Sequence, residues 1–506
     1  MKRIAHLIGL ILMAGAVSCS NGAEEDVFVI NCLEDLEGRT VSVLGGSVQD
    51  LLASDKISEC TFLRSDAETD AYTMVETGKA CAAVASSINW AVAENSFHNI
   101  VRVGEPMNPI PIGFAFNKGC PALLEEFNAF LKDYLEKTDI DKAVAEWMNP
   151  ESGRKMPDPD EVSGENGTLH FVTSAMVEPF SFIRQGEVVG AEAEILANFA
   201  AGRNMKWDFT SVAFSGLITF LQSGKADIGF SIMCITPERQ QCVDFSIPWT
   251  TESSVLLVGR EYAPAELLQS GSGDETSFLD SLKESLHKTL IKEDRYKMLL
   301  DGLGATLLIS ILSAIFGTLL GILLCFCSMR SNRLVSGAAN VYVEFMRCMP
   351  QVVLLMILFY VVFGNTEITG DWVAIIAFSL CFGAYTSVIF KSCVESIDKG
   401  QMEAALSLGF GRVKAFVNVV LPQAVQRAVP LYKGEFIGLV KATSIVGYIA
   451  VFDLTKAGDI IRSRTFEAFF PLILVTLLYF IVIYALTLAL KYIESKTQPK
   501  RKKFFK

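Results

Sequence analysis

Long apolar runs separated by short polar stretches fill the C-terminal part of the chain. Gly302–Met329, Cys348–Thr366, Trp372–Phe390 and Ala468–Leu490 contain no charged residue. About 20 apolar residues suffice to cross a bilayer. A weaker run, Pro430–Val451, contains charged residues, but charges inside a helix bundle can line a pathway. The pattern therefore predicts about five transmembrane helices.

Charged residues between these runs predict their orientation. The loops 330–341 and 391–428 and the C-terminal tail are basic, whereas Gly364–Asp371 contains no Lys or Arg. Because cytoplasmic loops carry an excess of Lys and Arg, the first helix starts outside and the last ends inside. Three basic residues run against this rule, since they fall in a loop placed outside: Lys456, Arg462 and Arg464.

The N-terminus has the pattern of a secretion signal. Lys2 and Arg3 precede an apolar run, Ile4–Val17, which is too short for a comfortable span. Ala16-Val17-Ser18-Cys19 resembles a bacterial lipoprotein box, which implies acylation of Cys19. The alternative is a plain signal peptide or an uncleaved anchor. In each case the following domain is expected outside the cytoplasm.

Two α/β blocks, joined by a linker, precede the membrane part. Buried strands followed by helices are predicted for Thr40–Leu44, Ala82–Ala85, Ile112–Phe116 and Leu169–Thr173. The linker is rich in Pro, Gly, Asp and Glu. The expected organisation is a signal segment 1–19, blocks 26–148 and 167–262 around linker 149–166, connector 263–298, membrane domain 299–492 and basic tail 493–506.

Composition excludes several classes of function. The formal charge of −12 gives no support for nucleic-acid binding. The 12 cysteines and 4 histidines show no zinc-ligand spacing, so neither a metal site nor a cofactor is expected in the chain. There is no phosphate-binding G-x-x-x-x-G-K-[ST] motif and no constellation of nucleophile and base. We therefore expect a protein that is not itself an enzyme.

A polar segment between two apolar runs carries the most specific motif. Glu403-Ala404-Ala405, then three residues and Gly409, are followed by Leu421-Pro422-Gln423-Ala424. We expect a short helix that Gly409 ends in the left-handed conformation, and a restart of the chain at Pro422. The segment resembles the ATPase-coupling loop of ABC importer permeases of the polar amino-acid uptake family. The resemblance implies that Glu403, Ala404, Ala405 and Gly409 contact a cytoplasmic ATP-binding subunit.

The two soluble blocks resemble the lobes of type 2 periplasmic binding proteins for amino acids. The second block carries the opening-lobe motifs Pro179-Phe180-Ser181-Phe182 and Thr236-Pro237-Glu238-Arg239, and the first carries Leu36-Glu37-Gly38-Arg39 and Gly45-Gly46-Ser47. In the family the opening lobe comes first, whereas here it comes second. The resemblance therefore implies one circularly permuted α/β binding domain rather than two degenerate half-domains.

The same resemblance implies a ligand site, carried over position by position. Arg239 corresponds to the arginine that pairs with the ligand carboxylate, Phe214 to the stacking aromatic residue, and Gly46 and Ser47 to the turn that opens a helix toward the ligand. Cys234 replaces a hydroxyl residue. Ser86 stands where an ammonium-binding aspartate is expected, so an amino group lacks that partner unless Glu178 replaces it.

Together these features predict the permease subunit of an ATP-driven importer fused to its own receptor for a small carboxylate-bearing solute, with an amino acid favoured. The implied partners are a separate ATP-binding subunit that uses ATP, a second permease copy of the same or another kind, and membrane lipid, in a bacterial inner membrane. The alternative is a ligand-gated channel or a solute sensor. A channel of that type would place its pore between the lobes, and a sensor would need a cytoplasmic output domain.

Overall fold

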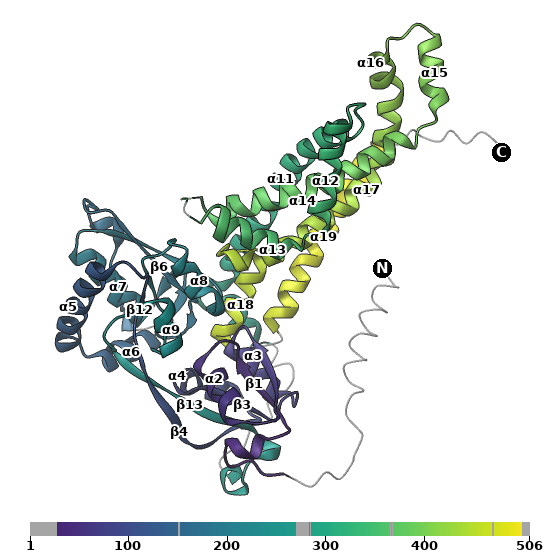
Figure 1. Cartoon of the computed structure of the whole chain (residues 1–506). Coiled ribbons are helices and arrows are strands. Elements are labelled where there is room, and N and C mark those ends of the chain that lie inside the picture. The colour runs from purple at the N-terminus through teal and green to yellow at the C-terminus, as the bar shows by residue number, and fades with distance from the viewer. Residues whose placement is uncertain are drawn as a thin grey trace.

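The computed structural model describes residues 28–149, 152–269, 283, 285–364, 366, 368–467 and 470–497. The expected signal segment, Cys19 and the end of the basic tail lie outside these residues. The described chain has an α/β part at one end of a set of long helices (Figure 1).

The first α/β lobe, here lobe A, is built on a five-stranded sheet in the order β2-β1-β3-β13-β4. Its apolar strands are covered by short helices that bury Leu36, Tyr72 and Trp90. The strands are β1 (Thr40–Leu44), β2 (Thr61–Ser65), β3 (Ala82–Ser86), β4 (Ile100–Ile112) and β13 (Thr250–Gly259). The helices are η1 (Leu33–Leu36), α2 (Val48–Lys56), α3 (Glu68–Glu76) and α4 (Ser87–Ala93).

The second lobe, lobe B, has a five-stranded sheet with the equivalent arrangement, in the order β10-β6-β11-β5-β12. It also has a three-stranded sheet, β7-β8-β9. An aromatic core that includes Phe127, Trp147 and Phe171 holds it together. The strands are β5 (Ala115–Phe116), β6 (Thr168–Thr173), β7 (Met176–Val177), β8 (Ser181–Arg184), β9 (Glu187–Val189), β10 (Lys206–Ser211), β11 (Ile228–Gly229) and β12 (Asp244–Phe245). The helices are α5 (Pro121–Lys137), α6 (Ile140–Met148), α7 (Ala191–Gly202), α8 (Leu217–Gln222) and α9 (Pro237–Cys242).

The chain crosses between the lobes twice. After β4 it enters lobe B as β5, and after β12 it returns to lobe A as β13, which pairs antiparallel with β3 and β4. Helices α5 and α6 therefore pack on lobe B although they lie in the expected first block, and β13 joins lobe A although it lies in the second. The boundary between the lobes thus differs from the boundary between blocks 26–148 and 167–262, because each sheet takes one strand from the other block.

The membrane part is entirely helical. Three helices are long and apolar enough to span a bilayer, and up to five spans result if each of two bent helix pairs counts as one. The first pair bends by 106° between the end of α12 and the start of α13, where Pro350 lies. Residues 333–341, which were expected in a loop, belong to α12. The helices are α11 (Arg295–Ser328), α12 (Arg333–Cys348), α13 (Gln351–Met356), α14 (Gly370–Glu395), α15 (Lys399–Ser407), α16 (Arg412–Ala415), α17 (Leu421–Ala442), α18 (Leu454–Thr465) and α19 (Phe470–Thr497).

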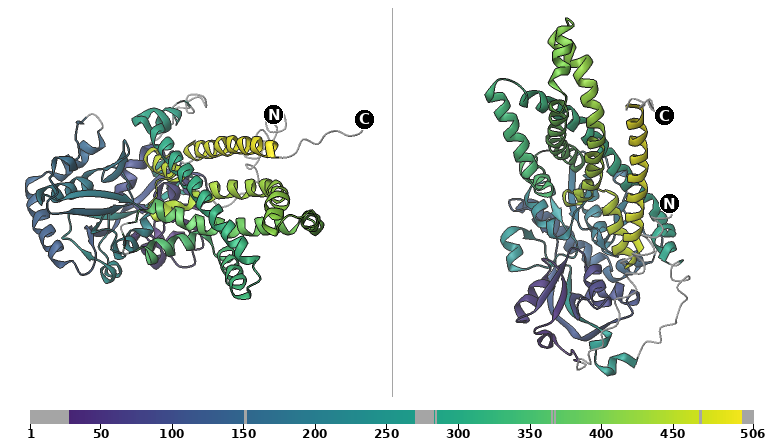
Figure 2. Two further views of the ribbon diagram at one scale, coloured as in Figure 1. Left: turned by 90° about the horizontal axis from the view of Figure 1, so that it is seen from above. Right: turned by 90° about the vertical axis from the view of Figure 1, so that its right-hand side faces the viewer.

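Helices α11 and α14 form the centre of this bundle. They approach closely at Gly321, where an added Cβ would overlap the Thr386 hydroxyl. The predicted fold class, a two-lobed α/β binding domain of type 2 followed by an all-α membrane domain, is confirmed. Both views in Figure 2 place the α/β lobes at one end of the helices and the hairpin of α15 and α16 at the other.

Candidate functional site

A cavity of about 80 Å³ lies between the two lobes. On this measure roughly 10–15 Å³ holds one water, so the cavity suits a small solute. Six of the seven residues predicted to bind a ligand line it: Ser47, Ser86, Glu178, Phe214, Cys234 and Arg239. The seventh, Gly46, contributes a carbonyl oxygen that accepts a hydrogen bond from Arg239.

Arg239 is the cation of this cavity and is only 9% exposed. Its guanidinium donates to the carbonyl of Cys234 at 3.1 Å and to that of Gly46 at 3.2 Å, and lies 5.6 Å from the ring centre of Phe214. Burial lowers the pKa of the Arg239 guanidinium. No described carboxylate pairs with it. A buried, unpaired guanidinium favours an anionic ligand, and a carboxylate matches its planar donors.

The turn at Gly46 and Ser47 positions a helix end at the cavity. Gly46 has a φ of +72°, which a glycine adopts without strain. Ser47 caps α2, because its hydroxyl oxygen accepts from the amide of Asp50 at 3.1 Å. Its hydroxyl hydrogen is left to donate to a ligand.

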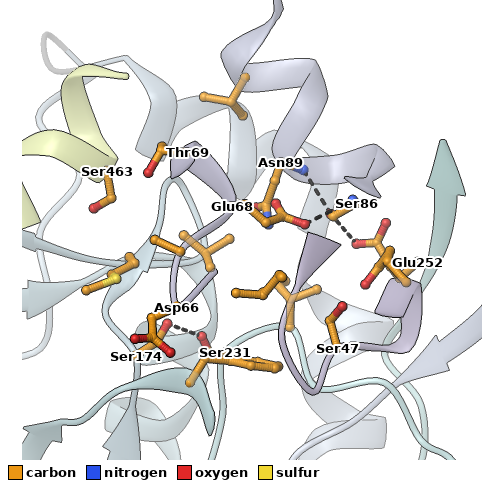
Figure 3. Close-up of a pocket in the computed structure, with 18 of the residues that line it drawn as sticks. Ser47, Asp66, Glu68, Thr69, Ser86, Asn89, Ser174, Ser231, Glu252 and Ser463 are labelled. Carbon is orange, nitrogen blue, oxygen red and sulfur yellow. Dashed lines mark hydrogen bonds between the residues drawn. The ribbon is translucent and has the colours of Figure 1, made fainter. Parts of the chain in front are cut away.

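Ser86 connects two carboxylates in the cavity lining, those of Glu68 and Glu252, as Figure 3 shows. Its amide donates to Glu68 at 3.0 Å and its hydroxyl donates to Glu252 at 2.9 Å. Glu252 also accepts from the amide of Ser87 at 2.9 Å, and neither glutamate has a basic partner among the described residues. Burial raises the pKa of Glu68, and burial together with the charge of Glu68 raises the pKa of Glu252 to about 7. A cationic group would compensate these charges.

Sequence reasoning missed Glu68 and Glu252. One available signal was a carboxylate inside β13, whose neighbours from Val255 to Val258 form an apolar run. A second was the acidic start of α3 directly after strand β2.

Glu178 lines the cavity but its carboxylate is engaged by arginines. It lies 3.4 Å from Arg464 of α18 and 4.0 Å from Arg184. The residue expected to replace the ammonium-binding aspartate is therefore held by the membrane domain, while Glu68 and Glu252 flank Ser86.

Helix α18 closes the edge of the cavity from the membrane domain. Ser463 and Phe466 belong to the cavity lining. Arg462 pairs with Asp70 of lobe A at 3.0 Å, and Arg464 donates to the carbonyl of Ile183 in lobe B at 2.5 Å. Two of the three basic residues that run against the charge rule thus bind the two lobes.

The predicted coupling segment forms a hairpin at the far end of the helices (Figure 1). Helix α15 ends as predicted, with Gly409 at a φ of +86°. Glu403 and Ala404 are exposed and Ala405 is buried. Leu408 and Val413 expose 78% and 76% of their surface.

Comparison with known proteins identifies the family of the membrane part. Residues 287–499 match the family model described as binding-protein-dependent transport system inner membrane component. The chain is 35% identical over 203 residues to the arginine transport system permease protein ArtQ of Bacillus subtilis, covering 39% of this chain and 91% of that protein. It is 31% identical to the permease protein GlnP of Rickettsia felis over 203 residues, covering 39% of this chain and 92% of that protein.

Among solved structures, the chain is similar to the crystal structure of an amino acid ABC transporter with histidines. The identity is 28% and the TM-score 0.39, covering 44% of this chain and all of that chain.

Proposed function

The chain belongs to the family of binding-protein-dependent transport system inner membrane components, and from that membership we propose that it is the permease of an ATP-driven importer fused to its own receptor. The observation that carries this proposal is the position of α18. This helix belongs to the family-matched part of the chain and lines the cavity between the lobes through Ser463, together with Phe466 directly after its end. Receptor and permease therefore act on the same solute.

The solute we propose carries both a carboxylate and an amino group. Arg239 binds the carboxylate, Phe214 covers the apolar part, and Ser47, Gly46 and Cys234 border the same end of the cavity. Glu68 and Glu252, joined by Ser86, face the amino group. The name of the relative ArtQ, an arginine transport permease, supports an amino acid.

Residues 28–262 act as one receptor in a permuted order, with one ligand per chain. The exchanged strands β5 and β13 support this, because neither block contains a complete five-stranded sheet. A stoichiometry of two ligands per chain, measured by titration calorimetry, would contradict it.

ATP is used by a separate cytoplasmic subunit that docks on the hairpin of α15 and α16. Glu403, Ala404, Ala405 and Gly409 form the contact, supported by the exposure of Glu403, Ala404 and Gly409 and by the exposed apolar Leu408 beside them. The receptor faces outward, anchored by Cys19, and two permease copies pair in the inner membrane.

The test is reconstitution of the full chain with its ATP-binding subunit in proteoliposomes. A panel of L-amino acids is first screened by thermal shift, where a ligand at 100 times its dissociation constant stabilises by about 2.7 kcal/mol. The ligand found should accumulate only with ATP present. Flux down its gradient without ATP would favour a channel instead.

A further inference from the structure

A second cavity, of about 200 Å³, lies where both lobes meet the membrane domain. It borders the ligand cavity, because Asp66, Ala67 and Met176 line both. Its membrane-domain walls come from α18 and from Ser444, Gly447 and Tyr448, which precede that helix. This second space, here called the junction cavity, therefore adjoins the ligand cavity on the side of the membrane domain.

Lys456 of α18 lines the junction cavity and is only 7% exposed. Its stem packs on Gly447, where an added Cβ would lie 3.9 Å from the Cβ and Cδ of Lys456. Its ammonium makes no hydrogen bond or ion pair with any residue in the described part of the chain. Its Nζ atom is not among the buried, unsatisfied polar atoms of the described residues, so it stays accessible from the cavity, where an anionic group can bind it.

The neighbouring carboxylates are committed elsewhere. Asp453 accepts from the amides of Thr455 at 3.1 Å and Lys456 at 3.0 Å, as the cap of α18. Asp459 pairs with Arg462 at 3.3 Å, and Arg462 also pairs with Asp70. No carboxylate of the described lining lies within ion-pair distance of the Lys456 ammonium, although the charges of Asp459 and Asp453 act on it from farther away.

We propose that Lys456 forms a transit site that binds the carboxylate of the solute between the receptor and the permease helices. The inference rests on the proposed import function and adds a second site to it. Asp66 and Asp70 in the same lining disfavour simple anions and suit a solute that also carries an amino group. The class of ligand is therefore a small zwitterion.

The test compares Lys456→Met, Lys456→Arg and the control Lys297→Met, whose lysine is exposed and pairs with Asp294. Each full chain is assembled with its ATP-binding subunit in proteoliposomes and given a uniformly ¹⁴C-labelled mixture of L-amino acids. We expect Lys456→Met to lower uptake at least tenfold, Lys456→Arg to retain most of it, and Lys297→Met to match the unmodified chain. Equilibrium binding of the mixture should change less than twofold, because Lys456 lies outside the ligand cavity.

The melting temperature separates transit from a structural role. Removing an unpaired charge from the interior should leave the melting temperature of Lys456→Met unchanged or raise it. Wild-type uptake by Lys456→Met, or a lower melting temperature or misfolding of this variant, overturns the transit site. Absence of uptake by the unmodified chain instead overturns the import function on which the inference rests.

Discussion

Arg464 of α18 lies 3.4 Å from the carboxylate of Glu178, at the edge of the ligand cavity. Arg464 also pairs with Glu293 at 2.6 Å, and its side chain is 2% exposed. Two residues earlier, Arg462 binds lobe A through Asp70. One short helix of the membrane domain thus holds both lobes, and opening the cleft requires breaking at least one of these ion pairs.

Substitution of Arg464 should destabilise the full chain strongly. Arg464→Met leaves Glu178 and Glu293 without this buried partner, and such a loss costs about 3–5 kcal/mol. Denaturant unfolding followed by tryptophan fluorescence measures the change. The control is Arg203→Met, which removes a half-exposed ion pair with Glu126 and should cost no more than about 1 kcal/mol. Equal losses in the two variants would contradict the role of α18.

Arg239→Ala should weaken ligand binding by about 2–5 kcal/mol, because a buried ligand carboxylate loses its charged partner. Arg239→Lys should recover part of the affinity, since an ammonium lacks the two parallel donors of a guanidinium. Calorimetric titration of the full chain measures both. Arg203→Ala, on the outside of lobe B, is the control and should bind normally. Unchanged affinity in Arg239→Ala would place the carboxylate elsewhere.

Ligand binding should depend on pH through Glu252. Its pKa is raised to about 7 in the free protein, so below pH 7 the carboxyl is protonated and a cationic group loses its partner. Affinity for an aminated ligand should therefore rise between pH 6 and pH 8, by at most about tenfold per pH unit. The raised pKa also means that the folded state binds more protons than the unfolded state, so stability falls as the pH rises toward 7.

Calorimetry at pH 6, 7 and 8 checks this pH dependence. Glu252→Gln should flatten it, and so should a ligand analogue without the amino group. Because Glu178 is held by Arg464, Glu178→Gln should leave the slope unchanged. A slope that depends on Glu178 rather than Glu252 would assign the amino group to the other side of the cavity.

The features that could be predicted from the sequence are those that depend on a local pattern of residues. The coupling motif identified the family, which is confirmed, and Gly409 adopts the left-handed conformation expected of it. The missed features depend on pairing between distant segments. Strand β13 completes a sheet that begins more than 200 residues earlier in the chain, and Glu178 meets Arg464 286 residues away. Alternation of apolar residues within one strand contains no information about such partners.

The coupling surface gives the last prediction. Gly409→Arg should abolish ATP-driven uptake while ligand affinity stays normal, because the hairpin lies at the opposite end of the helices from the cavity (Figure 2). Two effects act together: a bulky cation enters the exposed surface beside Leu408, and a side chain is forced to a φ of +86°. Gly409→Asn separates them, since asparagine tolerates this backbone conformation and is small. Gly409→Asn should retain most of the uptake.

Both variants are compared by ATP hydrolysis with and without ligand and by calorimetry of ligand binding. Full ligand-stimulated hydrolysis in Gly409→Arg would mean that the ATP-binding subunit docks elsewhere.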